Sequence, residues 1–194
     1  DLFWEQRFPH SIGLLYSAFT AFLGFRVHNG EYKVMGMSPY GEPNYVDQVK
    51  KLITINRDGS FELDIDYFSY HDAATHSFNG KFTSLFGEPR VHGDDFFTAK
   101  SEPGRAGEAE ALRRNQYYAD VAATIQTYTE EALLRMVNHL HAETALDRLV
   151  MAGGVGLKSD ANGRILRGTS LHAVYHQPDP RETSAPRGAG RHAR

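Results

Sequence analysis

The sequence predicts an α/β fold with one sizeable hydrophobic core, and three observations support that prediction. The chain has 194 residues, of which 41% are hydrophobic, which is enough for one large domain. A long stretch from about residue 108 to 142 repeats apolar residues at helical spacing. After it come a short apolar run, a second helical pattern and another apolar run. This strand, helix, strand order is the unit of layered α/β domains with a parallel or mixed sheet.

The composition argues against several classes of protein. A formal net charge of −3 provides no basic field for nucleic acid, and the lack of cysteine excludes disulfides, thiolate zinc sites and a cysteine nucleophile. No apolar run approaches the roughly 18 residues of a membrane helix. The N-terminus lacks a secretory signal and starts at Asp1 rather than Met, which suggests a chain that begins within a larger protein. We expect a cytoplasmic protein with neither nucleic-acid nor membrane partners.

The first predicted element is a helix over residues 11–25. Pro9 and Ser11 are start signals, and Gly24 ends the run. The apolar residues follow three- and four-residue steps. They are Ile12, Leu15, Phe19, Phe22 and Leu23.

The next predicted elements are short. Residues 31–43 contain Gly36, Pro39 and Gly41 and predict a shaped loop with one helical turn. A short helix is expected from Tyr45 to Leu52. Residues 52–68 then predict a β-hairpin, because two strand-like runs flank the tight-turn dipeptide at 58–59.

The second half of the chain contains the long helix and the strand, helix, strand unit. Residues 66–108 are polar and irregular, with one small helix expected within 81–89. A buried strand at 147–154, a helix at 155–166 and a strand at 171–179 complete the order, and residues 181–194 lack large apolar side chains and predict a disordered tail. The apolar stripe of the long helix at about 108–142 is Val121, Ile125, Tyr128, Ala132, Met136 and Leu140.

The corner at Gly153 and Gly154 allows two interpretations. Free backbone amides at the start of a helix attract phosphate, and glycine lets a ligand come close to the backbone. A tight strand-to-helix turn also needs glycine for steric reasons alone, and this interpretation is favoured for an isolated Gly-Gly pair. The spacing matches neither the dinucleotide-binding nor the P-loop pattern.

Other polar clusters predict no catalytic or metal chemistry. Four histidines lie in the polar middle segment or on the long helix, and none shows the i,i+4 spacing of a helical zinc site, so they are expected at the surface or in caps. The acidic pairs Asp94–Asp95 and Asp64/Asp66 are expected to be solvated, and no Ser-His-Asp arrangement is visible. The histidines are His71, His76, His139 and His141.

Two longer blocks are far more specific than these short motifs. Residues 8–43 read FPHSIGLLYSAFTAFLGFRVHNGEYKVMGMSPYGEP, and residues 149–166 read LVMAGGVGLKSDANGRIL. Both blocks resemble the carbamoyltransferase family, which includes nodulation-factor and antibiotic-tailoring enzymes. The first is similar to the family's F-P-H-S-L-G-L-L-Y-S-A-F-T and G-E-Y-K-V-M-G-L-A-P-Y-G segments, and the second to its A-G-G-V-A-L-N-x-x-A-N-G segment. The resemblance covers about residues 8–180.

The resemblance implies a fold, a reaction and partners. The fold is that of actin-like ATPases with ribonuclease-H-like halves, with residues 1–180 forming the C-terminal portion of such a domain and 181–194 a divergent tail. Carbamoyl phosphate and ATP give carbamoyl-adenylate, and the carbamoyl group then passes to a hydroxyl of a sugar or antibiotic-like acceptor. A divalent metal, iron, would polarise the carbamoyl group, with Mg²⁺ accompanying ATP. A homodimer is the expected assembly.

The resemblance also implies the residues of a nucleotide cleft. Met35, Tyr40 and Gly41 would border it, and the alternatives for all these positions are helix capping, packing and structural turns. For Ser11 and Ser17 the comparison is with ribose-binding acidic groups of related proteins, where His10 is an alternative to Ser11. The implied positions are Ser11, Gly13, Ser17, Gly24, Lys33, Gly36, Gly153, Gly154, Val155 and Lys158.

Departures from the family pattern leave two functional hypotheses. Lys158 stands where the family has Asn, and Glu182 falls on the metal-binding Asp and is the one metal-ligand candidate. The family's histidine metal motif and its adenylate-forming domain do not occur in these 194 residues. The chain is therefore either part of an O-carbamoyltransferase that is inactive by itself, or a non-catalytic, nucleotide-binding scaffold that retains the fold.

Overall fold

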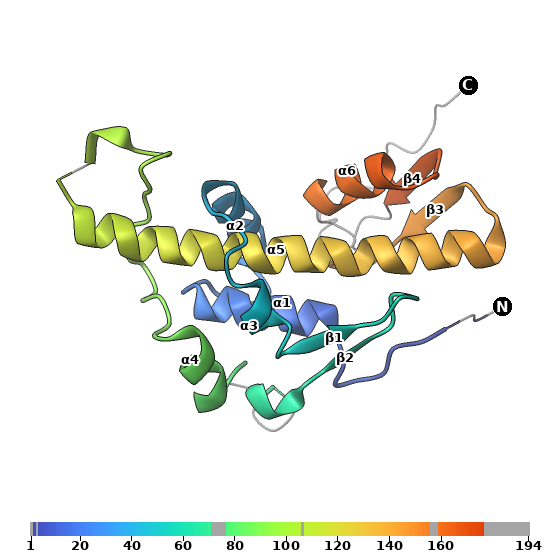
Figure 1. The fold of residues 1–194 in the computed structure, drawn as a ribbon, viewed down its shortest axis with the longest axis horizontal. Helices are drawn as coiled ribbons and strands as arrows, with labels where there is room; N and C mark the ends of the chain where they lie inside the picture. Colours follow the sequence, from blue (N-terminus) through green and yellow to red (C-terminus); the bar gives the residue numbers. More distant parts are fainter. Residues whose placement is uncertain (1, 3, 71–76, 106, 156–158, 177–194) are drawn as a thin grey trace, which may run out of the picture.

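One long helix, α5 (Ala109–Thr144), organises the fold. The computed structural model describes residues 2, 4–70, 77–105, 107–155 and 159–176. α5 is about 54 Å long at 1.5 Å per residue, and the other elements lie along it (Figure 1). It ends at Ala145, whose left-handed backbone donates its N–H to the carbonyl of His141. The predicted long helix is confirmed.

The predicted first helix is also confirmed, as α1 (Ile12–Phe22). The Ser11 side chain accepts a hydrogen bond from the Leu14 amide, and Gly24 follows the helix with a φ of 77°. The apolar face of α1 packs against α4 (Gly80–Phe86), the small helix expected within 81–89. Phe19 and Phe82 meet edge to face with ring centroids 5.1 Å apart.

The segment at 31–43 is more helical than predicted. α2 (Glu31–Met37) has seven residues, and a 3-10 helix η1 (Ser38–Tyr40) continues it, so the expectation of a loop with one turn is wrong. Gly36 lies within α2 at a small propensity cost, and Pro39 lies in the first turn of η1, where its missing N–H is tolerated. The burial of Val34 and Met37 outweighs both helix-breaking signals.

The predicted hairpin is confirmed as β1 (Ile53–Ile55) and β2 (Phe61–Leu63), an antiparallel pair with Thr54 opposite Glu62. The helix before it, α3 (Val46–Val49), is shorter than the predicted Tyr45–Leu52. Two further 3-10 helices, η2 (Ile65–Tyr67) and η3 (Pro103–Arg105), lie in the irregular region. Figure 1 shows α1 and the hairpin along one side of α5.

The strand, helix, strand unit is present as β3 (Arg148–Met151), α6 (Ser159–Gly168) and β4 (Ala173–His176). β3 and β4 pair in parallel, with Leu149 opposite Val174. The prediction that the first strand is buried is wrong: Val150 is 66% exposed, because only one face of this pair packs against helices. The predicted tail at 181–194 lies outside the described residues.

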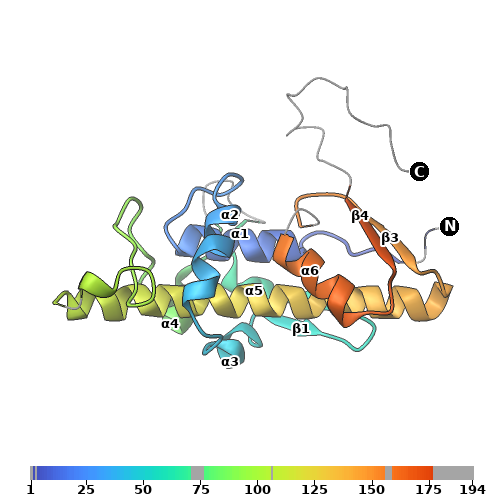
Figure 2. The ribbon, with the colours of Figure 1, turned by 90° about the horizontal axis from the view of Figure 1, so that it is seen from above.

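Two hydrophobic clusters lie along α5. The larger one gathers α1, α2, α4 and the hairpin, and the smaller one is centred on Leu133, Val137, Ile165 and Leu171. Val155 packs against both clusters. In Figure 2, α6 lies over the second half of α5, at an angle to it. Within the described part of the chain, no helix combines the length and the apolar character that a membrane span requires.

Candidate functional site

The start of α1 and the glycine corner after β3 lie in contact. A Cβ built on Gly13 would lie 3.4 Å from Cγ2 of Val155 and 3.6 Å from Oγ of Ser11. The two sequence blocks that resemble one family, far apart along the chain, therefore meet in the folded molecule. At these distances a methyl group at position 13 would make ordinary van der Waals contact, so packing does not require glycine there.

The backbone conformation requires glycine at one position of the corner but not at the other. Gly153 has a φ of 89°, a conformation that strains any other residue, so the turn itself explains it. Gly154 has no such φ, and among the described residues, chain neighbours aside, no heavy atom lies within 4 Å of a Cβ built on either glycine. Neither the turn nor packing against the described residues therefore requires glycine at position 154.

The two candidate serines of α1 both make hydrogen bonds within the protein. Ser11 Oγ accepts from the Leu14 amide at 3.3 Å, which is the capping role. Ser17 Oγ donates to Oε1 of Glu31 at 3.0 Å. Ser17 follows Gly13 by four residues, so both lie on one face of α1. The alternative residue at the start of the helix, His10, accepts at Nδ1 from the Leu63 amide.

Glu31 is a polar group of this site that the sequence analysis did not identify. Its carboxylate accepts from Ser17 and from the backbone amides of His28 at 2.9 Å and Gly30 at 3.1 Å. Desolvation by burial raises the pKa of Glu31, but these hydrogen bonds together lower it below its ordinary value. A carboxylate offers about four lone-pair sites, and these three hydrogen bonds together with one from the backbone amide of Glu31 itself occupy them. Its position at the first turn of α2, one residue after a glycine, was the available signal.

Acid is expected to remove a stabilising contribution of Glu31. A carboxyl group whose pKa is lowered by folding stabilises the protein above the unfolded pKa, and this contribution is lost as pH falls through the folded pKa. The free energy of unfolding, measured by urea denaturation, should therefore fall below pH 4.5, the ordinary pKa of the group. Glu31→Gln should lose part of this pH dependence, whereas Glu62→Gln, at an exposed position of β2, should keep it. Equal pH profiles for the two variants would contradict the prediction.

Three further candidate residues show no contact with the corner among the described residues, and one of them, Gly24, lies at the far end of α1. Gly24 follows the opposite end of α1, about 16 Å from its start, and a Cβ there would lie 2.7 Å from the Arg90 carbonyl oxygen. Lys33 on α2 holds its ammonium group 5.7 Å from the ring centroid of Phe25. Gly36 also lies on α2 and borders open space.

The remaining candidates are packed or lie outside the described residues. Gly41 contacts the backbone of α5, Tyr40 packs against Phe96, and Met35 packs against the larger cluster. Lys158 and Glu182 belong to the part of the chain that the structure does not describe.

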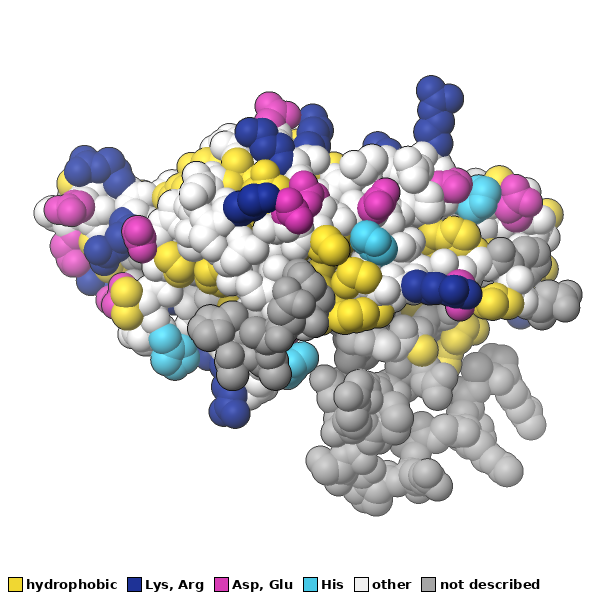
Figure 3. Space-filling model, turned by 90° about the horizontal axis from the view of Figure 1, so that it is seen from below, with side chains coloured by type: hydrophobic (Ala, Val, Ile, Leu, Met, Phe, Trp, Pro, Cys, Tyr) yellow, Lys and Arg dark blue, Asp and Glu magenta, His cyan; other side chains and the backbone are white. Residues whose placement is uncertain are grey.

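No metal centre is found among the described residues, where no group of three His, Asp or Glu side chains could hold an ion. His139 is exposed, and Nδ1 of His141 lies 2.7 Å from the Leu146 carbonyl oxygen, so the prediction of surface or capping histidines is confirmed for these two. On the face shown in Figure 3 the histidines lie apart from one another, and charges of both signs are interspersed. His71 and His76 lie outside the described residues.

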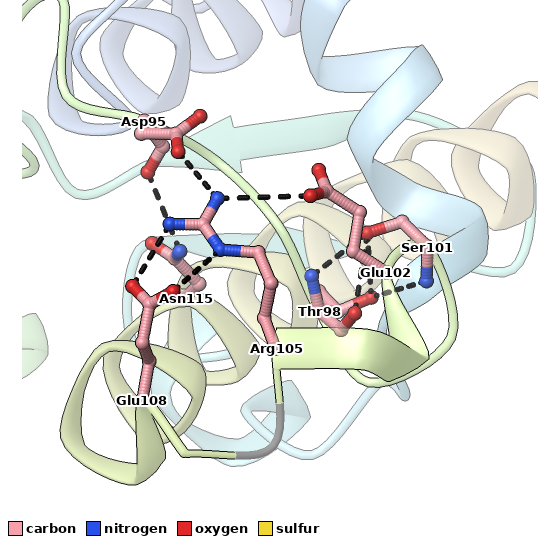
Figure 4. A network of polar contacts seen from close by, with 7 residues as sticks. All are labelled: Asp95, Thr98, Ser101, Glu102, Arg105, Glu108 and Asn115. Carbon is pink, nitrogen blue, oxygen red and sulfur yellow. Dashed lines mark hydrogen bonds and ion pairs between the residues drawn. The ribbon is translucent and has the colours of Figure 1, made fainter.

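Both predicted acidic pairs are exposed at least in part, but their members also have protein partners. Asp95 pairs with Nη1 of Arg105 at 2.5 Å, and Arg105 also pairs with Glu108 (Figure 4). Asp66 pairs with Lys81 at 2.6 Å, and the Asp64 side chain accepts from the Asp66 amide. Exposed ion pairs such as these contribute little stability.

A pocket of about 170 Å³ lies away from the glycine corner, between the C-terminal end of α5 and β3. Apolar side chains line much of it, including Leu140, Leu146 and Leu171. The candidate nucleotide residues are not among its lining. The pocket therefore does not support the nucleotide assignment.

Comparison with known proteins gives a consistent set of relatives. The family described as "Carbamoyltransferase N-terminus" matches residues 1–190. The uncharacterized protein sll1178 of Synechocystis sp. is 44% identical over 176 residues, covering 90% of this chain and 26% of the relative. Nodulation protein NolNO of Sinorhizobium fredii is 26% identical over 94% of this chain and 23% of its own. Nodulation protein NolO of Bradyrhizobium diazoefficiens is 26% identical over 93% of this chain and 28% of its own. The chain thus spans about a quarter of the length of these relatives.

Proposed function

The chain belongs to the carbamoyltransferase family, whose N-terminal domain it matches, and from this premise we propose that it forms one wall of the nucleotide site of an O-carbamoyltransferase. In the proposed reaction, carbamoyl phosphate loses its phosphate to water, and the resulting carbamate attacks the α-phosphorus of ATP, which gives carbamoyl-adenylate and releases pyrophosphate. An acceptor hydroxyl of a sugar or antibiotic-like molecule then attacks the carbamoyl carbon, and AMP leaves. We propose this carbamoyl-transfer activity for a full-length protein, in which the present chain would form one side of the nucleotide site.

The observation that supports this proposal is the contact between Gly13 and Val155 beside the open glycine corner. Backbone amides near Gly154 are suited to phosphate oxygens, since no side chain of the described residues lies within 4 Å of a Cβ built there. Ser17 lies one helical turn after Gly13 on α1, and its hydroxyl oxygen, oriented by the hydrogen bond to Glu31 of α2, supplies an acceptor for a ribose hydroxyl. The proposed ligand would run from the corner along this face of α1.

The described residues do not form a metal-binding site. They contain no group of three candidate ligands, and the one ligand suggested by resemblance, Glu182, lies outside them. We therefore assign no step of the reaction to a metal in this part of the chain.

The narrower fold assignment is also a proposal. The parallel β3–β4 pair connected through α6 is the kind of unit from which actin-like, ribonuclease-H-like domains are built. We propose that residues 1–180 are the C-terminal portion of such a domain.

A nucleotide-binding scaffold without transfer activity is the second candidate. The short span of the chain relative to its relatives favours this candidate for the isolated polypeptide. We expect the purified chain to bind ATP or a carbamoyl-adenylate analogue in calorimetry, and to give no carbamoylated sugar when supplied with carbamoyl phosphate and ATP. No binding at millimolar ligand would overturn the nucleotide site, and measurable turnover would show a complete enzyme.

Gly154→Ala tests the corner directly. The added methyl group enters open space and meets no strained φ, so the free energy of unfolding should change by less than about 1 kcal/mol. The same methyl group would occupy the proposed phosphate position, and the Kd for ATP should rise by about tenfold. Gly80→Ala is the matched control, because its Cβ also meets open space but at the start of α4. Equal ATP affinity in the two variants would count against the corner as the phosphate site.

A further inference from the structure

A continuous set of hydrogen bonds joins α1, α5 and α6. The Tyr16 hydroxyl donates to Oε1 of Gln126 at 2.9 Å. Nε2 of Gln126 donates to Oε1 of Glu130 at 2.8 Å. Nη1 of Arg164 donates to the other oxygen, Oε2 of Glu130, at 2.8 Å. We call these four residues the Glu130 relay.

The chemistry of Glu130 fixes the direction of every bond in the relay. A carboxylate only accepts, so Gln126 must turn its amide N–H toward Glu130. The amide oxygen then faces Tyr16, whose hydroxyl must donate to it. The Tyr16 side chain and Gln126 are buried, and the Glu130 side chain is 13% exposed. In such buried surroundings hydrogen bonds are strong, and a polar group left without a hydrogen-bond partner destabilises the fold.

The relay crosses the boundary between the two hydrophobic clusters. Tyr16 belongs to the larger cluster, and Arg164 precedes Ile165, a fully buried member of the smaller one. Val155 of the glycine corner packs against both clusters. Gln126 and Glu130 are four residues apart and therefore lie on one face of α5, so the relay joins α1 and α6 along that face.

We propose that Glu130 is a positioning residue: its ion pair with Arg164 holds α6 and the glycine corner in register with Gly13 and Ser17 of α1. The inference rests on the proposed nucleotide site and identifies the residue that fixes the separation of its two halves. Without this pair, the apolar contacts of Val155 and Ile165 still hold α6 on α5, but the corner is free to shift.

The neighbouring carboxylate provides a matched control. Glu131 pairs with Arg135 at 2.9 Å within α5, and both side chains are 40% exposed. Arg135 also donates to the Ile55 carbonyl of β1 at 3.1 Å, so the described partners of this pair lie on α5 and β1, and exposed i,i+4 pairs contribute about 0.3–0.5 kcal/mol. Glu131→Gln therefore repeats the chemical change of Glu130→Gln without touching the relay.

The experiment compares Glu130→Gln and Glu131→Gln in the full 194-residue chain with two measurements. The first is amide hydrogen exchange of peptides from α6 without ligand, and the second is the Kd for ATP by calorimetry. Glu130→Gln is expected to speed α6 exchange about tenfold and to raise the Kd about tenfold, because the new amide must direct an N–H toward a donor. Glu131→Gln should leave both within about twofold of the parent.

Arg164→Gln breaks the same ion pair from its other partner and allows the test to be made if Glu130→Gln does not fold. Arg164→Gln should speed α6 exchange and raise the Kd for ATP as Glu130→Gln does. The double variant should show exchange rates and a Kd no larger than those of either single variant, because both substitutions remove the same interaction. Unchanged α6 exchange in Glu130→Gln, or losses that add in the double variant, would overturn the positioning role. Failure of the parent chain to bind ATP would instead overturn the proposed function, and the exchange rates would still decide whether Glu130 holds α6.

Discussion

Gly41→Ala is expected to lower the free energy of unfolding by more than about 4 kcal/mol, an unusually large effect for one methyl group. A Cβ at this position would lie 2.1 Å from the Ala119 carbonyl oxygen and 2.5 Å from the Asp120 nitrogen. Both atoms belong to the backbone of α5, so no side chain can rotate to make room. Urea denaturation should show the loss, and the melting temperature should fall by about 10 °C or more.

The segment around Gly41 cannot relieve the clash by moving away without breaking hydrogen bonds. Asp120 accepts from the Glu42 amide at 2.9 Å and from Nδ2 of Asn44 at 3.0 Å. Gln116 donates to the Tyr40 carbonyl at 3.0 Å. Moving the loop would release these groups as well, which adds to the cost of the substitution.

Gly36→Ala is the control for this prediction, since it makes the same change five residues earlier. Beyond the helix's own backbone, no described atom lies within 4 Å of a Cβ built at Gly36, which is inside α2. Alanine is the better helix former by about 0.8–1 kcal/mol, so this variant should be as stable as the parent or more stable. Similar stabilities for Gly36→Ala and Gly41→Ala would show that the contact with α5 is wrong.

The elements that the sequence predicted best are those with strong local signals. α5 and α1 have long apolar stripes at helical spacing, and the hairpin has a tight turn at Asp58–Gly59. Ser11 and Gly24 act at the ends of α1 as sequence rules for caps suggest. In these cases the local preference and the tertiary packing agree, which is why pattern alone was sufficient.

The elements that were missed depend on packing that a local pattern does not contain. α2 forms despite Gly36 and Pro39, because its apolar side chains are buried against the rest of the core. The exposure of Val150 depends on how many layers cover the β3–β4 pair, which four strand residues cannot reveal. A local sequence pattern predicts which residues form a strand, but it does not predict which helices or strands pack against its two faces.

In the candidate site, too, the sequence indicated some residues correctly and missed or misplaced others. The resemblance of two blocks to one family implied that they share a cleft, and the contact between Gly13 and Val155 brings those blocks together. The resemblance could not separate Gly24 from this group, because a glycine that ends a helix and a glycine beside a ligand look alike in sequence. Glu31 was missed because its interaction with Ser17 joins two helices.

Phe82→Ala is expected to destabilise the fold by about 3–5 kcal/mol. Phe82 is fully buried, and its ring lies 5.1 Å from that of Phe19, 5.5 Å from that of Phe22 and 4.8 Å from that of Phe86. Truncation would leave a cavity and remove aromatic contacts of about 0.5–1.5 kcal/mol each beyond the buried area. Thermal and urea denaturation should both report the loss.

The position of this aromatic cluster links Phe82 to the candidate site. Phe19 and Phe22 are buried on α1, whose less buried face presents Gly13 and Ser17. The rings therefore hold the helix that the proposed nucleotide would follow, so the Kd for ATP should rise in Phe82→Ala even at temperatures where the chain is still folded. Val91→Ala removes an exposed apolar side chain and should change stability by less than about 0.5 kcal/mol, with an unchanged Kd. A Phe82→Ala variant as stable as Val91→Ala would refute the aromatic support of α1.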